Sequence, residues 1–189
     1  MKISKIWLSA AVVLFTSSTL LAGEFVLYGG AQKPGTLTWS EATDVPADLF
    51  DGEFGGTIGA RFSAGRVIGF EQNVSYTPKF GKSGVRAFQT DSNLLIQAPG
   101  KVVPYATAGI GIITTWGQEL PSDLDPEDIA AFAFNIGTKF SVNYGGGIKV
   151  RRLLGPVGIS FDVRGYTIPD AHNATLHIIQ TSAGLAVNW

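Results

Sequence analysis

The sequence contains no cysteine, and this absence excludes several arrangements before any motif is considered. No disulfide can form, so an exported form of the chain has no covalent staples. Lipid attachment of the lipoprotein type, which needs a cysteine near the cleavage point, is excluded as well. If the chain is exported, ordinary burial or a membrane must therefore stabilise its fold.

Long hydrophobic runs are also missing beyond Gly23. A membrane-spanning helix needs about 20 consecutive apolar residues, and no later stretch approaches that length. Yet 45% of the residues are hydrophobic. Two classes remain open, namely a soluble β-sandwich or barrel and a transmembrane β-barrel, in which the apolar residues lie at alternate positions.

Charge is sparse, at 15% of the residues. Without Lys2 and Lys5, which lie in the predicted leader, 12 basic residues remain against 15 acidic ones. The sequence shows no basic patch, so we do not expect a nucleic acid as partner. We expect no cofactor or metal either, because no cluster has the spacing of metal ligands and the glycine runs 109–111 and 145–147 lack the Lys-Ser/Thr of a phosphate loop.

Residues 1–23 have the pattern of a secretory signal peptide. Two lysines are followed by an apolar run from Ile6 to Phe15 and then by small and polar residues. We expect cleavage near Ala22 or Gly23. Residues 24–189 then form one domain.

Eight segments of this domain are predicted to be strands. The connections between them alternate, the first, third, fifth and seventh being longer or more polar, as in bacterial outer-membrane barrels. Residues 151–156 are predicted to be a turn, and the sixth strand is long enough to hold a bulge. The strands are expected at 24–32, 54–64, 67–78, 86–97, 102–115, 131–150, 157–168 and 175–189.

Period-two alternation within these strands separates two faces. In 157–168, Val157, Ile159, Phe161 and Val163 share one face, opposite residues that include Asp162. A sandwich would alternate too, but its solvent face is normally rich in Lys and Glu. Here the polar face consists mostly of Gly, Ser, Thr and Asn, which suits the narrow interior of an eight-stranded barrel. We therefore expect bulky apolar side chains outside and small or charged ones inside.

The end of the chain, "SAGLAVNW", matches the assembly signal of outer-membrane proteins, with Trp in place of the commoner Phe. "PYATAGIG" (104–111), "NYGGGIKVR" (143–151) and "FDVRGY" (161–166) also resemble the family of small OmpA- and OmpX-like outer-membrane β-barrel domains. The resemblance implies an all-β, eight-stranded antiparallel up-and-down transmembrane barrel in the cell outer membrane. It implies contact with outer-membrane lipids and recognition by the barrel assembly machinery, and it implies no reaction. The assembly-signal residues are Ser182, Gly184, Val187 and Trp189.

Isolated charges on the polar face are the first candidate site. We predict that they form a network in the lumen, either as structural salt bridges or as a gated path for protons or small ions. Lys149 and Glu24 are candidates to join them. The predicted network consists of Arg61, Glu71, Asp162, Arg164 and Lys139.

Two further candidates lie at the predicted outer loops. His172 and His177, with Ser182 and Asp170 nearby, would suit an outer-membrane lipid A deacylase, although the His-x-Ser signature of those enzymes is missing. An acidic loop, 123–128, could bind a divalent cation or another surface ligand, or could simply be solvated.

Taken together, these patterns favour a monomeric, non-enzymatic barrel with a structural or surface-interaction role and a lumen filled by side chains. A narrow porin-like channel or transport component is the alternative, and lipid A deacylation is a weaker one. A soluble lipocalin-like barrel would need the bulky face turned inward.

Overall fold

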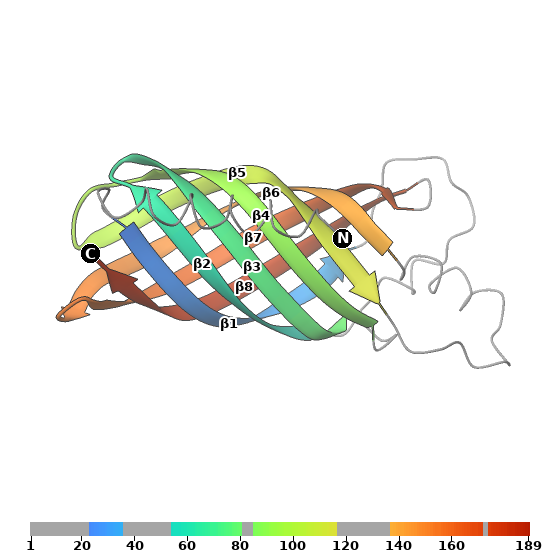
Figure 1. The fold of residues 1–189 in the computed structure, drawn as a ribbon, viewed down its shortest axis with the longest axis horizontal. Coiled ribbons are helices and arrows are strands. Elements are labelled where there is room, and N and C mark those ends of the chain that lie inside the picture. Colours follow the sequence, from blue (N-terminus) through green and yellow to red (C-terminus); the bar gives the residue numbers. More distant parts are fainter. Residues whose placement is uncertain (1–22, 36–53, 81–84, 117–136, 172–173) are drawn as a thin grey trace, which may run out of the picture.

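The computed structural model describes residues 23–35, 54–80, 85–116, 137–171 and 174–189, which form a closed, all-antiparallel barrel (Figure 1). Each strand pairs with the next, and β8 pairs with β1, from Glu24 opposite Asn188 to Gly35 opposite His177. The predicted fold class is confirmed. The strands are β1 (Gly23–Gly35), β2 (Gly55–Gly65), β3 (Ile68–Phe80), β4 (Val85–Gln97), β5 (Val102–Trp116), β6 (Gly137–Leu154), β7 (Val157–Ala171) and β8 (Ala174–Asn188).

None of the described residues belongs to a helix with the length and apolar character needed to cross a membrane.

The strand ends differ from the prediction most clearly at residues 151–156. These were predicted to be a turn, but β6 continues to Leu154 and the turn consists of Gly155 and Pro156. The predicted bulge is present here, because the β6–β7 register shifts between Val150 and Leu154. The bulge lets β6 run further than simple alternation suggests. Residues 131–136 of the predicted sixth strand, like the predicted signal peptide and the acidic loop, lie outside the described residues.

Alternation places the two faces of each strand as predicted. On β7, Phe161 and Val163 are 54% and 55% exposed, whereas Asp162 and Arg164 are 3% and 1% exposed. Successive side chains of a strand point to opposite faces, so one face of every strand lines the lumen and the other covers the outside. The inward face carries the charges and the outward face carries the bulky hydrocarbon.

The lumen also contains an apolar layer that the sequence analysis did not anticipate. Its members come from β4, β5, β7 and β8, near the end of the barrel that carries the two long connections, 36–54 and 117–136. Hydrocarbon fills a narrow space without needing hydrogen-bond partners, so it can occupy a dry part of the lumen. This apolar layer consists of Ala87, Ile113, Tyr166, Ile168, Leu176 and Ile178.

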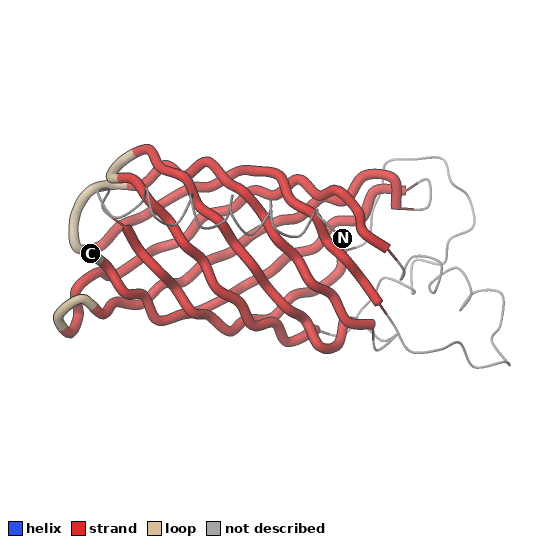
Figure 2. The backbone as a smooth tube through the Cα atoms, viewed as in Figure 1, coloured by secondary structure: helices blue, strands red, loops and turns tan. Residues whose placement is uncertain are grey.

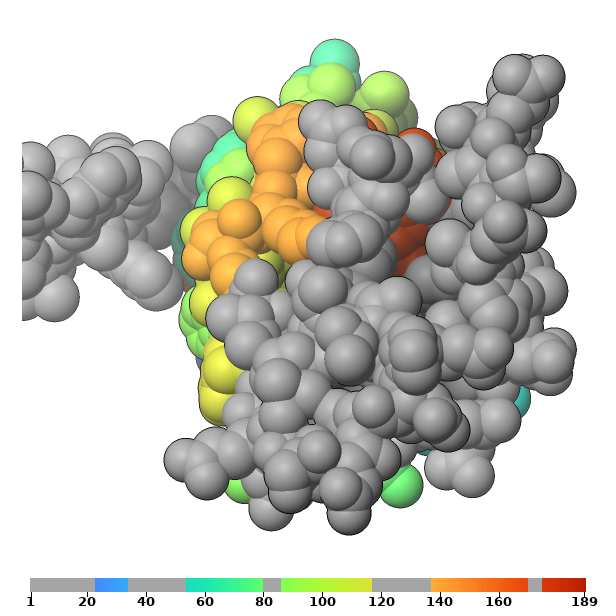
Figure 3. Space-filling model, turned by 90° about the vertical axis from the view of Figure 1, so that its right-hand side faces the viewer, coloured from blue at the N-terminus to red at the C-terminus, as the bar shows by residue number. Residues whose placement is uncertain are grey.

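The two ends of the barrel differ. The short connections 66–67, 98–101 and 155–156 lie at one end together with the chain terminus, and we call this the short-turn end (Figure 2). There the backbone of Trp189 exchanges hydrogen bonds with Gly23, at 3.1 and 3.3 Å, and closes the β1–β8 seam. Figure 3 faces the opposite end, where β5 and β6 lie side by side at the rim.

Arg152, within the β6 bulge, has a backbone φ of +56°. All other non-glycine residues that the structure describes have a negative φ. The left-handed region costs an L-residue about 1–2 kcal/mol, because Cβ approaches the following carbonyl oxygen. The barrel therefore carries local strain at its short-turn end.

Replacing Arg152 with glycine should relieve this strain. We expect Arg152→Gly to raise the free energy of unfolding by about 1 kcal/mol, since glycine adopts positive φ without a Cβ clash. Denaturant titration followed by tryptophan fluorescence measures the change. Leu153→Gly, in the same bulge, is the control and should lower the free energy of unfolding; an equal loss in both variants would contradict the assignment of strain.

Candidate functional site

Four charged side chains meet in the centre of the lumen. Nη1 of Arg164 lies 2.7 Å from Oε1 of Glu71, and its Nε lies 2.7 Å from Oδ1 of Asp162. The second oxygen of Asp162 lies 3.2 Å from Nη1 of Arg61. All four residues are at most 3% exposed. We call them the central charge cluster; it contains two cations and two anions and is balanced.

Barrel closure brings these residues together from opposite walls. Asp162 and Arg164 are two positions apart on β7 and therefore share the inward face. Arg61 and Glu71 come from β2 and β3, which lie across the lumen from β7 in the strand order. The cluster thus spans the barrel and ties distant strands to one another.

A shell of hydrogen bonds surrounds the cluster. Tyr105 donates its hydroxyl hydrogen to Asp162 and accepts a hydrogen bond from Nη1 of Arg61 at 3.2 Å. Nη2 of Arg61 donates to Ser182 at 2.5 Å, and its guanidinium lies 4.3 Å from the ring centroid of Tyr28. Buried charges are tolerated only when such partners are supplied, and the shell supplies them to Arg61 and Asp162.

A second polar group lies beside the cluster on β3 and β4. Asp91 accepts hydrogen bonds from Asn73 at 2.9 Å and from Gln89 at 3.1 Å. Asn73 in turn accepts from the hydroxyl of Tyr28 at 2.8 Å, and Asn93 donates to Glu71 at 3.1 Å. These contacts connect polar side chains of three strands, β1, β3 and β4, and through Glu71 they join the central charge cluster.

Glycines provide the room for these side chains. A Cβ at Gly147 would lie 2.9 Å from the hydroxyl of Tyr105, and one at Gly145 would lie 2.9 Å from Cγ of Arg164. Both distances are shorter than real Cβ contacts, so these inward positions of β6 accept no larger residue without a shift. The glycine run 145–147 therefore serves close approach inside the wall of the barrel.

A smaller charge group lies nearer the short-turn end. Nζ of Lys149 lies 2.5 Å from Oε1 of Glu24, and Nε of Arg151 lies 3.3 Å from Oε2 of the same carboxylate. Lys149 and Glu24, two of the additional lumen candidates, thus pair with each other rather than with the central charge cluster.

Lys139 does not lie in the central charge cluster. It is half-buried near the start of β6, six residues from Gly145, the position opposite Arg164. At about 3.3 Å per residue, this separation is about 20 Å along the strand. The structure therefore brings together four of the five predicted charges.

Sequence reasoning missed several members of the network, among them Tyr28, Asn73, Asp91 and Tyr105. The signal was present for some of them, because Gln89, Asp91 and Asn93 alternate on one face of β4. The tyrosines gave no such signal, since an aromatic side chain on a barrel strand suits the outer face equally well.

The histidine candidates do not form a Ser–His pair in the described part of the chain. His177 lies with Nδ1 2.8 Å from Oγ1 of Thr167, whereas Ser182, five positions along β8, points into the lumen toward Arg61. Odd and even positions of β8 face opposite sides, so His177 and Ser182 cannot meet. His172 and the side chain of Asp170 lie outside the described residues. The residues that the structure describes also contain no group of three His, Asp or Glu side chains suited to a metal ion.

The four residues of the predicted assembly signal have two kinds of environment. Ser182 and Gly184 face the lumen, where a Cβ on Gly184 would lie 2.8 Å from Cβ of Tyr28. Val187 and Trp189 face outward, 44% and 50% exposed. Their role in assembly stays a prediction.

Comparisons with known proteins identify the fold but no family. No family model matches the sequence, and no curated protein matches it. Among solved structures the chain is similar to Neisserial surface protein A (NspA), with 13% identity over 88% of this chain and 97% of that one and a TM-score of 0.56. It is also similar to the N-terminal β-barrel domain of Pseudomonas aeruginosa OprF, with 9% identity over 88% of this chain and 97% of that one and a TM-score of 0.55. The P. aeruginosa outer membrane protein OprG is similar as well, with 12% identity over 89% of this chain and 97% of that one and a TM-score of 0.54. None of these three is named as an enzyme. The likeness shows an eight-stranded fold shared with outer-membrane barrels.

Removing one member of the central charge cluster should be costly. We expect Arg164→Met to lower the free energy of unfolding by about 3–5 kcal/mol, because it leaves Glu71 buried without its cation. Adding Glu71→Gln should restore part of the loss, since Asp162 keeps Arg61. Denaturant titration of the single and double variants measures both effects.

Arg86→Met is the control, because Arg86 is exposed on β4 outside the cluster. It should change the free energy of unfolding by less than about 1 kcal/mol. Equal losses for Arg86→Met and Arg164→Met would show that the cluster does not brace the barrel.

Proposed function

We propose that this chain, which has the fold of eight-stranded outer-membrane barrels, is an integral protein of the cell outer membrane with a structural or surface-interaction role. In this proposal the outside of the barrel contacts lipid and its own side chains close the lumen. The long connections are then the parts available for interaction at the cell surface.

The distribution of exposed hydrocarbon is the observation that carries the proposal. Large hydrophobic side chains stand exposed on all eight strands, whereas the lumen holds the buried charges. Soluble monomers rarely expose contiguous apolar patches of more than a few hundred Å². A soluble lipocalin-like barrel would need the opposite arrangement. Exposed examples, one from each strand, are Leu27, Ile58, Val74, Leu94, Ile110, Val142, Val163 and Leu185.

Aromatic side chains near both ends of the barrel support the same reading. Trp116 and Tyr76 stack with ring centroids 6.2 Å apart near the end with the long connections. Trp189 and Phe62 lie 6.0 Å apart at the short-turn end. Aromatic residues concentrate in two girdles where a transmembrane barrel meets the membrane interfaces.

The filled lumen favours a closed barrel over a channel. An eight-stranded barrel is only just wide enough to be filled by side chains. Here the central charge cluster crosses the lumen and the apolar layer lies beyond it. Free diffusion of solutes would require both to move.

A narrow channel is the second candidate, and one observation favours it. Polar atoms of Asn143, Tyr166 and Gln180 are buried without a hydrogen-bond partner among the residues that the structure describes. Asn143 and Tyr166 are neighbours across β6 and β7, and Gln180 lies opposite Arg164. Buried polar groups of this kind are commonly satisfied by water, which would hydrate part of the lumen.

The depth dependence of a charged substitution tests the membrane proposal. Val163 lies in the middle of β7 and faces outward, so Val163→Arg should destabilise the protein by about 2–4 kcal/mol in phosphatidylcholine vesicles. Val157→Arg, beside the turn at Gly155 and Pro156, is the control and should cost about 0–1 kcal/mol. Urea titration of vesicle-folded protein measures both. Equal costs, or recovery of the wild type as a soluble periplasmic protein, would contradict the proposal.

Conductance distinguishes the closed barrel from the channel. We expect no current from the wild-type protein in planar bilayers over a wide voltage range. Steady single-channel currents from the folded wild-type protein that are absent when the same protein is unfolded before addition would instead establish the second candidate.

A further inference from the structure

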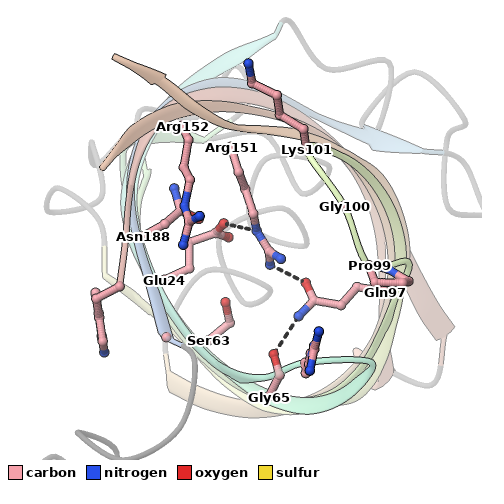
Figure 4. A pocket seen from close by; sticks show the side chains of 13 residues that line it. Glu24, Ser63, Gly65, Gln97, Pro99, Gly100, Lys101, Arg151, Arg152 and Asn188 are labelled. Atoms are coloured by element: carbon pink, nitrogen blue, oxygen red, sulfur yellow. Dashed lines mark hydrogen bonds and ion pairs between the residues drawn. The ribbon is translucent and has the colours of Figure 1, made fainter. Parts of the chain in front are cut away.

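The short-turn end of the barrel opens into a cavity of about 480 Å³ that has several cationic residues in its lining. Among the described residues, four of those that line it are basic, and Glu24 supplies the side-chain carboxylate; Arg151 and Arg152 point into the cavity, whereas the side chain of Lys101 points away from it at the rim (Figure 4). The volume falls within the range of pockets that hold small molecules. We call this site the basic mouth; its cations are Arg66, Lys101, Arg151 and Arg152.

The carboxylate of Glu24 does not neutralise the basic mouth. It is already shared between Lys149, at 2.5 Å, and Arg151, at 3.3 Å, so this group of three carries a net charge of +1. Arg66, Lys101 and Arg152 form no ion pair with any described residue. The central charge cluster, by contrast, is balanced. The basic mouth therefore carries an excess of positive charge, unlike the central charge cluster.

The β6 bulge turns two neighbouring arginines toward the same space. In a regular strand Arg151 and Arg152 would point to opposite faces. The positive φ of Arg152 breaks this alternation, and both side chains point into the mouth (Figure 4). Strained backbone of this kind persists where the surrounding structure holds it, and it clusters at functional sites.

Arg151 is held in place with part of its donor capacity unused. Its Nε lies against Glu24, and its Nη2 donates to Oε1 of Gln97 at 2.9 Å. Gln97 is itself fixed, because its Nε2 donates to the carbonyl oxygen of Gly65 at 2.8 Å (Figure 4). A guanidinium has five N–H donors, so Nη1 of Arg151 remains available to a ligand.

From this geometry we propose that the basic mouth binds a phosphate group, carried either by an anionic phospholipid or by a small soluble phosphate. Guanidinium groups match the oxygens of phosphate in bidentate hydrogen bonds, and each such bond is strengthened by charge. Arg152 supplies a free guanidinium, Arg151 a pre-oriented one, and Arg66 and Lys101 contribute charge at the rim. Binding in detergent does not depend on the proposed membrane location, so the two proposals fail separately.

Isothermal titration calorimetry of the purified protein, folded in a nonionic maltoside detergent, tests this site. The probes are inorganic phosphate, short-chain phosphatidylglycerol and short-chain phosphatidylcholine as the zwitterionic control. Arg152→Gly removes one guanidinium while relieving backbone strain, so it should fold at least as well as the wild type. We expect this variant to bind the anionic probe at least tenfold more weakly. Arg86→Gln, an exposed cation on β4 away from the mouth, is the matched control and should leave the affinity unchanged.

Each outcome decides between sources or overturns the site. Binding of phosphatidylglycerol alone supports a lipid headgroup, binding of inorganic phosphate alone supports a soluble phosphate, and binding of both supports recognition of the phosphate group itself. Equal binding of phosphatidylcholine, no binding of either anion, or equal losses in Arg152→Gly and Arg86→Gln would overturn the proposal.

Discussion

Arg164, held between Glu71 and Asp162, is the contact on which the interior of this barrel depends. Its ion pair with Glu71, at 2.7 Å, joins β7 to β3. Its ion pair with Asp162, also at 2.7 Å, lies within β7 and leaves the second oxygen of Asp162 to Arg61 on β2. Charges buried to this extent are costly unless each has a partner. The rest of the lumen is therefore arranged to satisfy them, with Tyr105 on Asp162 and Asn93 on Glu71.

The narrow circumference of eight strands explains the composition of the chain. Long charged side chains and tyrosines fit in the lumen only if the inward positions beside them are bare, and Gly145 beside Arg164 and Gly147 beside Tyr105 provide such places. The abundance of glycine and the sparse charge thus share one cause, which is the limited volume inside the ring. The outward face has no such limit and carries bulky side chains on every strand.

The chemical character of the barrel changes along its axis as well as between its inner and outer faces. The apolar layer, with Ile113 and Ile178 among its members, occupies the lumen toward the long connections, and the balanced central charge cluster lies in the middle. The basic mouth lies at the other end. The interior therefore differs chemically from one end of the barrel to the other, whereas the outer face is apolar on every strand.

Alternation along each strand was enough to predict the eight-stranded architecture, because the period of two follows from strand geometry. It also predicted that Asp162 and Arg164 point inward. The outward position of Phe161 and Val163 follows from the same period. Alternation could not predict which inward residues meet, since Arg164 and Glu71 are 93 positions apart and only the closure of β8 on β1 sets their distance. The same limit applies to Lys139, which shares the inward face but lies at another level. It applies also to the β6 bulge, where a single positive φ at Arg152 changes the direction of a side chain that strict alternation would have placed on the opposite face. Local patterns determine inside and outside; the ring, through its register and its curvature, determines the contacts.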